Sequence, residues 1–149
     1  MNPDVLFSLA NAWILPAWLL LAFAPRWKYT PYIVILGGVI PLAVCYSFLL
    51  FTSISAMDMD TFASLDNISN AFSSKKALLT GWVHYLAFDL FVGFSITYDG
   101  LKQRIPAIAR IFALFFTLMS GPFGLLLYFI IRVVKTGNVN INLTNTVTT

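Results

Sequence analysis

An uncharged stretch runs from Val5 to Pro25 near the start of the chain. As an α-helix rising about 1.5 Å per residue it would extend roughly 30 Å, which is the thickness of the hydrocarbon core of a lipid bilayer. Three more stretches are long and mostly apolar, and one of them carries two ionisable side chains in its interior, His84 and Asp89. The pattern predicts an all-α integral membrane four-helix bundle, with spans at about 5–25, 31–57, 77–98 and 107–132.

The composition excludes an ordinary soluble domain. Hydrophobic residues make up 59% of the 149 residues and charged residues 10%, whereas soluble domains average about 25% charged residues. The net charge is only +3 and no run of basic residues forms a stripe, so we expect no nucleic-acid partner. A single cysteine, Cys45, excludes an intrachain disulfide and a thiolate metal cluster.

A short amphipathic segment separates the second and third spans. Phe62, Leu65, Ile68 and Phe72 recur at spacings of three and four, with two acids before them and two lysines after them. Apolar residues at this spacing, with acids first and bases last, are typical of a helix. We expect a short interfacial helix at about 61–73 with its apolar face on the membrane, or, as an alternative, a lid folded back over the bundle.

Two interruptions and the ends of the chain complete the organisation. Pro41 is expected to kink the second span. The sequence Ser-Gly-Pro-Phe-Gly at 120–124 interrupts the fourth span, and we predict a packing notch there in preference to a locally opened helix that lines a cavity.

One transmembrane domain should cover 1–135, followed by a flexible polar tail at 136–149. Four crossings divide the bases five against four, and the basic cluster after the first span favours both chain ends on the outer side.

Ionisable side chains inside a span are costly, which makes His84 and Asp89 the first candidates for function. They lie roughly 140° apart around a helix axis, whereas Tyr85 is one turn before Asp89 and can hydrogen-bond it. His84 would need a partner on another helix, and Ser8 and Asn11 are candidates because they face the same way on the first span.

In the functional interpretation Asp89 is a general acid or base and His84 is the complementary proton carrier. The alternative is a buried polar network that only fixes helix packing. One histidine and two separated aspartates fall short of a metal-ligand set, and no glycine-rich nucleotide loop occurs, so we expect neither a metal nor another cofactor. Aromatic side chains crowd the third span and suit a flat polyene. The side chains expected to contact a substrate are Trp82, Tyr85, Asn11 and Asp99.

One segment of the third span, Gly-Trp-Val-His-Tyr-Leu-Ala-Phe-Asp-Leu-Phe-Val-Gly at 81–93, resembles the signature of the abscisic-acid-deficient-4-like family. The Trp-x-His-x-x-x-x-Asp-Leu core is its most specific part. The resemblance covers nearly the whole chain up to Arg132. Other matching segments are 6–11 with Leu15-Pro16, 98–100 and 121–128.

The resemblance implies action on a carotenoid or xanthophyll, or assistance to an enzyme that does so. Plant members are associated with the rearrangement of violaxanthin to neoxanthin, in which an epoxide opens to an allenic alcohol without redox change. Such an isomerisation needs an acid and a base, and the buried Asp89 and His84 are the residues whose chemistry could supply them without a cofactor.

The chain carries no transit peptide, so it looks like a prokaryotic member acting on a different polyene or isoprenoid. We expect it among lipids in a bacterial plasma membrane, or in a thylakoid membrane if the source is a phototroph. A homo-oligomer stays open. Two other functions stay open. One is a non-catalytic pigment- or lipid-binding or assembly subunit, and the other is a proton or small-solute carrier that works as an oligomer.

Overall fold

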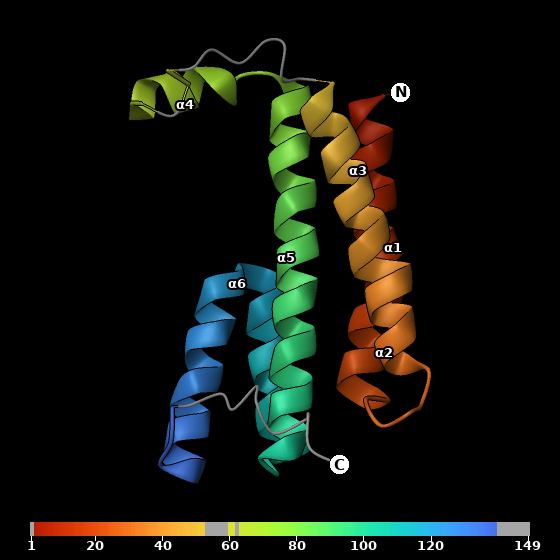
Figure 1. Cartoon of the computed structure of the whole chain (residues 1–149), viewed down its shortest axis with the longest axis vertical. Helices are drawn as coiled ribbons and strands as arrows, with labels where there is room; N and C mark the ends of the chain where they lie inside the picture. The colour runs from red at the N-terminus through yellow and green to blue at the C-terminus, as the bar shows by residue number, and fades with distance from the viewer. Residues whose placement is uncertain (1, 53–59, 62, 140–149) are drawn as a thin grey trace, which may run out of the picture.

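The computed structural model describes residues 2–52, 60–61 and 63–139, and this part of the chain holds helices and no strand. Figure 1 shows long helical columns standing together, a short helix across one end, and a folded helix against the lower half of the central column. The all-α prediction is confirmed for the described residues. Four helical segments are long and apolar enough to cross a membrane.

The first column is α1, Pro3–Phe23. It begins where Asn2 Oδ1 accepts a hydrogen bond from the backbone N–H of Asp4 at 2.9 Å, and Pro3 has no N–H to leave unpaired in the first turn. Asp4 also places a negative charge at the positive end of the helix dipole. The helix covers most of the predicted first span, 5–25.

The second column is a helix whose pitch changes along its length. Its parts are α2, Thr30–Tyr32, the π-helix η1, Ile33–Val39, and α3, Ile40–Phe51. Because Pro41 has no backbone N–H, the carbonyl of Gly37 loses its usual α-helical donor. The indole Nε1 of Trp13 in α1 donates to that carbonyl instead, at 2.7 Å. The disturbance predicted at Pro41 therefore takes the form of a widened turn that α1 stabilises.

The central column is α5, Lys75–Lys102, and it contacts every other long helix. The Ser74 side chain caps it by accepting from the backbone N–H of Ala77 at 3.2 Å. The apolar core lies along this helix because α1, α3 and the last helix all pack against it. Its most deeply buried apolar side chains are Val83, Leu86, Leu90 and Ile96.

The short helix α4, Leu65–Ala71, lies across one end of the columns (Figure 1). Ser64 caps it by accepting from the backbone N–H of Asn67 at 3.1 Å. Phe72, directly after the helix, packs its ring against Gly81 of α5. A Cβ atom at position 81 would lie only 2.8 Å from that ring. The glycine therefore lets α4 dock on α5, inside the range 61–73 predicted for an interfacial helix.

The last helix, α6, Ala107–Thr136, folds back on itself at Ser120. Ser120 has a non-helical backbone, with φ of −158° and ψ of 60°, and in Figure 1 the two arms run from this point toward the same end of α5. Arg110 of the first arm and Tyr128 of the second both lie against Gly100 of α5. A straight helix would hold these two residues about 27 Å apart along its axis.

Glycines allow this hairpin to close. A Cβ on Gly124 would overlap the backbone and hydroxyl of Thr117 in the first arm, and a Cβ on Gly121 would overlap the carboxyl of Asp89. Pro122 adds to the break because it cannot donate a backbone hydrogen bond. The packing notch predicted at 120–124 is thus wrong, since the backbone opens there and reverses the chain.

The hairpin changes the form of the fourth predicted span, 107–132. By length and composition α6 qualifies as a membrane helix. Each arm, however, is shorter than the roughly 20 residues that a crossing needs, and both arms return to the same end of the bundle. The first three spans are single helical columns and the fourth is a hairpin.

Some predictions lie outside the described residues. They are the end of the second span at 53–57, Phe62 of the interfacial helix, and 140–149 of the polar tail. At the described start of the tail, Thr136 still belongs to α6, and Gly137 closes the helix with a left-handed φ of 68°.

A side chain at the hairpin should weaken the fold. We expect Gly124→Val to lower the free energy of unfolding by about 1–3 kcal/mol, because the new side chain must push the Thr117 backbone away. Unfolding followed by circular dichroism in detergent measures the change. Gly37→Ala is the matched control, since a Cβ there meets only Ile33 at an ordinary 3.9 Å. Equal stability losses in both variants would contradict the hairpin contact.

Candidate functional site

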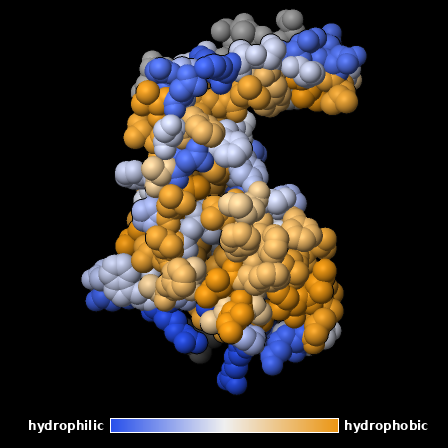
Figure 2. Space-filling model, turned by 180° about the vertical axis from the view of Figure 1, so that it is seen from behind, coloured by the Kyte–Doolittle hydropathy of each residue, from blue (hydrophilic) through white to orange (hydrophobic). Residues whose placement is uncertain are grey.

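A cavity of about 220 Å³ lies beneath α4, bounded also by α3 and α5. Figure 2, seen from behind, shows α4 overhanging a hollow on the flank of the molecule, above the mass of the α6 hairpin. Pockets for whole drug-sized ligands usually measure about 300–1,000 Å³, so this one suits a single end group of a longer molecule. The lining is Tyr46, Leu50, Thr61, Ile68, Ala71, Phe72, Ala77, Thr80, Gly81 and His84.

His84 is the polar centre of this cavity. Its ring stacks on Phe88 one turn further along α5, with centroids 4.5 Å apart, and meets Tyr46 of α3 at 5.1 Å. The side chain is exposed, so the imidazole remains accessible to a molecule in the cavity. The aromatic contacts hold the ring in place without occupying either ring nitrogen.

Asp89 lies in a different environment, against the tip of the α6 hairpin. Only 8% of the residue is exposed. Tyr85 and the backbone of Gly121 lie next to the carboxyl, while Oδ2 has no hydrogen-bond partner among the described residues. Tyr85 is thus a neighbour of Asp89, as their spacing predicted. The carboxylate faces the first N–H of the second arm, where a helix N-terminus favours negative charge.

The structure does not bring His84 and Asp89 into one site. His84 points into the cavity between α3, α4 and α5, whereas Asp89 points to the α6 hairpin. The cause is the helical geometry, because five residues along α5 turn the side chains roughly 140° apart. A single proton-transfer pair built from these two residues therefore has no support in the geometry.

Trp82 and Asn11 meet on the seam between α5 and α1. The Trp82 indole Nε1 donates to Asn11 Oδ1 at 3.2 Å, and Asn11 Nδ2 donates to the carbonyl of Phe7 at 2.7 Å. The expectation that Ser8 or Asn11 is the partner of His84 is wrong, because Ser8 donates to its own helix, at the carbonyl of Asp4. Neither Trp82 nor Asn11 lines the cavity beneath α4.

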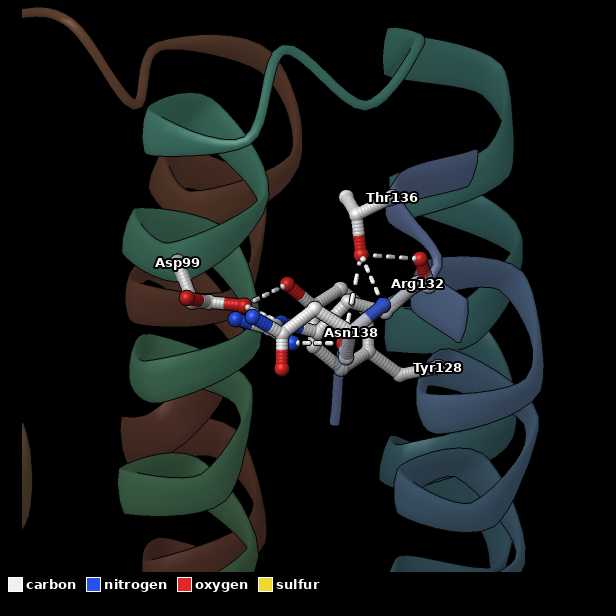
Figure 3. Close-up of polar contacts among 5 residues, drawn as sticks. All are labelled: Asp99, Tyr128, Arg132, Thr136 and Asn138. Atoms are coloured by element: carbon white, nitrogen blue, oxygen red, sulfur yellow. Dashed lines mark hydrogen bonds and ion pairs between the residues drawn. The ribbon is translucent and has the colours of Figure 1, made fainter. Parts of the chain in front are cut away.

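Asp99 belongs to a polar cluster at the opposite end of α5 (Figure 3). Its Oδ2 accepts from the Tyr128 hydroxyl at 2.5 Å and from Arg132 Nε at 2.7 Å. The two charged side chains are 12% and 2% exposed, so this is a buried ion pair. Arg132 also donates to the carbonyl of Asn138, and the Thr136 hydroxyl donates to the carbonyl of Arg132 at 2.8 Å. The cluster fastens the second arm of the hairpin to α5.

Two features of the site were missed from sequence. Tyr46 of α3 contributes to the cavity. The only available signal was the apolar face of the interfacial segment, which needed an apolar surface to pack against. Arg132 and Tyr128 bind Asp99, and no signal pointed to them because a single fourth span would place them far from Asp99. Among the described residues, no three His, Cys, Asp or Glu side chains gather as metal ligands do.

Comparison with known proteins gives a consistent picture. The model of the family described as ABA DEFICIENT 4-like matches residues 5–128. The chain is 26% identical over 143 residues to "Protein ABA DEFICIENT 4, chloroplastic" of Arabidopsis thaliana. The alignment covers 86% of this chain and 60% of that relative, so the chain spans well under two thirds of the relative's length. No solved structure is a significant match.

Loss of the buried ion pair should destabilise the protein far more than loss of an exposed one. We expect Asp99→Asn to lower the free energy of unfolding by about 3–5 kcal/mol, because it leaves the Arg132 guanidinium buried without a counter-charge. Asp4→Asn is the control, since the 3.0 Å Asp4–Lys75 pair has side chains 67% and 73% exposed, and it should cost at most about 1 kcal/mol. Chemical unfolding in detergent measures both; similar losses would refute a fastening role for the cluster.

Proposed function

Because the chain belongs to the ABA DEFICIENT 4-like family, we propose that it is a membrane protein that acts on one end ring of a xanthophyll or related isoprenoid. The observation that carries the proposal is the apolar cavity beneath α4 with the His84 imidazole in its wall. The family link to xanthophyll metabolism favours a pigment or lipid as the bound molecule. The helices are long and apolar enough to cross a membrane, and such apolar molecules are dissolved in the membrane.

The proposed topology has three crossings and one re-entrant hairpin. The columns of α1, α2 to α3, and α5 cross the bilayer, and α6 enters from one side, turns at Ser120 and leaves on the same side. Irregular backbone at membrane depth is tolerated where protein buries it. The tip meets this condition because Gly121 lies against the buried Asp89.

The charges then give a clear orientation. Seven of the nine Lys and Arg residues lie at the end where α1 and α5 finish, and only Lys75 and Lys76 lie at the other end. Cytoplasmic ends of membrane proteins carry the excess of basic residues. We therefore place the hairpin ends on the cytoplasmic side, or the stromal side in a chloroplast, and the cavity beneath α4 in the opposite leaflet. This replaces the placement of both chain ends on the outer side.

The chemistry of an epoxide-opening isomerisation fits one imidazole. The ring C–O bond breaks, the epoxide oxygen gains a proton, and a carbon of the polyene loses one as its C–H electron pair forms the new double bond. The formula does not change, so no oxidant or reductant is consumed. The imidazolium form of His84 gives the first proton, and the imidazole left behind accepts the second, so that one side chain acts in turn as general acid and general base.

Asp89 has a different task in this proposal. The carboxyl holds the tip of the hairpin through Gly121 and Tyr85, and it does not touch the molecule in the cavity. Trp82 and Asn11 tie α5 to α1, and Asp99 ties α5 to α6. These four residues position the helices, and His84 is the residue in contact with the reacting end group.

The location follows from the same premise. The named relative is chloroplastic, and a thylakoid membrane is the setting we propose if this chain comes from a phototroph. Nothing in the comparisons favours the bacterial plasma membrane.

Topology is testable by cysteine labelling in a Cys45→Ala background. A membrane-impermeant maleimide applied to intact bacterial spheroplasts should label Asp66→Cys on α4 and spare Lys28→Cys and Lys135→Cys until the membrane is opened. In a chain with four full crossings, Lys135 and Asp66 would lie on the same side. Labelling of Lys135→Cys together with Asp66→Cys would therefore exclude the re-entrant hairpin.

Activity is testable in a bacterial host that accumulates violaxanthin or other epoxide xanthophylls. We expect the intact chain to produce an isomer of unchanged mass and altered retention, and His84→Ala to lose it while the protein level stays normal. Ser95→Ala is the matched control, because Ser95 lies outside the cavity and its hydroxyl only bonds the Phe91 carbonyl of its own helix. Asp89→Asn should reduce the protein level together with any product.

Each result separates the candidate functions. Loss of product in His84→Ala and retention in Ser95→Ala supports an isomerase. If the pigments stay unchanged with all well-folded variants and a pigment copurifies with the protein, the isomerase proposal is refuted. The result would then support a binding or assembly subunit. Copurification lost on closing the cavity with Thr80→Trp would still place the pigment beneath α4.

A further inference from the structure

A second site is suggested at the basic end of the bundle, where Arg110 is buried without a counter-charge. Only 6% of Arg110 is exposed, and its Nε has no hydrogen-bond partner in the described chain. Its stem lies flat on α5 at Gly100, where a Cβ would come within 2.8 Å of Arg110 Cγ. A guanidinium that is held in this way would ordinarily be paired.

No acid of the surrounding chain is free to pair with Arg110. Asp99 is the only acidic residue between Ile96 and the end of the chain, and none occurs between Ala24 and Tyr29. The carboxylate of Asp99 already accepts from Tyr128 and Arg132.

A like charge near Arg110 makes the imbalance larger. Arg26, in the connection after α1, acts on Arg110 as a like charge, and its own side chain is exposed. Two neighbouring guanidinium groups repel each other unless an anion lies between them. Arg110 is in the first turn of α6, at the end of the bundle where the columns finish, which is the depth of lipid headgroups in the proposed topology.

We propose that Arg110, together with Arg26, binds the phosphate of an anionic lipid headgroup in the cytoplasmic leaflet. Guanidinium groups bind phosphate oxygens in a bidentate manner, and basic pockets between membrane helices on the cytoplasmic side suit such headgroups. The bound phosphate supplies the missing counter-charge beside the Asp99 cluster. This inference rests on the membrane topology proposed above and is independent of the chemistry at His84.

Native mass spectrometry of the detergent-purified full chain tests the site, with phosphatidylglycerol, phosphatidylcholine and inorganic phosphate as probes. We expect phosphatidylglycerol to bind at least about tenfold more tightly than phosphatidylcholine, and Arg110→Gln to remove most of that preference. Arg110→Lys should retain part of it, because it keeps the charge but loses the planar fork. Lys135→Gln, an exposed base in the last turn of α6, is the matched control and should change binding by less than about twofold.

Three outcomes would overturn the proposal. The first is equal binding of the two lipids, the second is an equal effect of Arg110→Gln and Lys135→Gln, and the third is full displacement of phosphatidylglycerol by inorganic phosphate, which would indicate a site for free anions. If Arg110→Gln fails to fold, Arg26→Gln carries the test, since Arg26 is exposed and its loss should still weaken lipid binding.

The test distinguishes this site from the proposed function. Resistance of the protein to alkaline extraction reports membrane insertion, and pigment analysis reports the chemistry at His84. If the protein is inserted in the membrane but shows no lipid preference, only the headgroup site is refuted. If alkali extracts the protein, the proposed membrane topology itself is refuted.

Discussion

The reversal of α6 at Ser120 determines most of the polar architecture of this protein. It brings the second arm back along α5, so that Tyr128 and Arg132 reach Asp99. It also directs the first backbone N–H of that arm at Asp89. A helix that begins in a low-dielectric interior leaves N–H groups to satisfy. Pro122 removes one of these donors, and the carboxyl of Asp89 lies against the backbone of Gly121, so the two residues together make an internal helix start possible.

A second example of the same constraint occurs in the neighbouring column. Pro41 deprives the Gly37 carbonyl of its donor, and the chain widens into a π-helical turn just before it. The Trp13 indole supplies a donor from α1. In both places a proline interrupts the regular helix, and a polar side chain from another helix lies against the break.

Sequence patterns predicted the parts of the fold that depend on local composition. Long uncharged runs indicated the columns, and the spacing of Leu65, Ile68 and Phe72 indicated α4. The hairpin was not predictable in this way, since hydropathy is the same for a straight helix and a folded one. Only the close packing of Gly124 on Thr117 distinguishes them. The expectation of a straight helix also left the partners of Asp99 unrecognised.

The candidate site was predicted in part for a related reason. His84 and Asp89 were singled out because both are ionisable within an apolar span, and the proximity of Tyr85 to Asp89 followed from their spacing. Which of them reaches an open cavity depends on α3, α4 and α6, whose placement around α5 is tertiary information. Trp82 was selected as a ligand-contacting aromatic, yet it donates to Asn11 on the adjacent helix.

The re-entrant form of α6 also bears on how such a protein is assembled. In the proposed orientation, the connection from α5 to α6 and the basic last turn of α6 stay on the side of the membrane where the ribosome works. The translocation machinery would then have no hydrophilic segment to export after α5 has crossed. The thirty residues of α6 can then insert from the cytoplasmic side at a late stage of biogenesis, after α1, α3 and α5 have packed together.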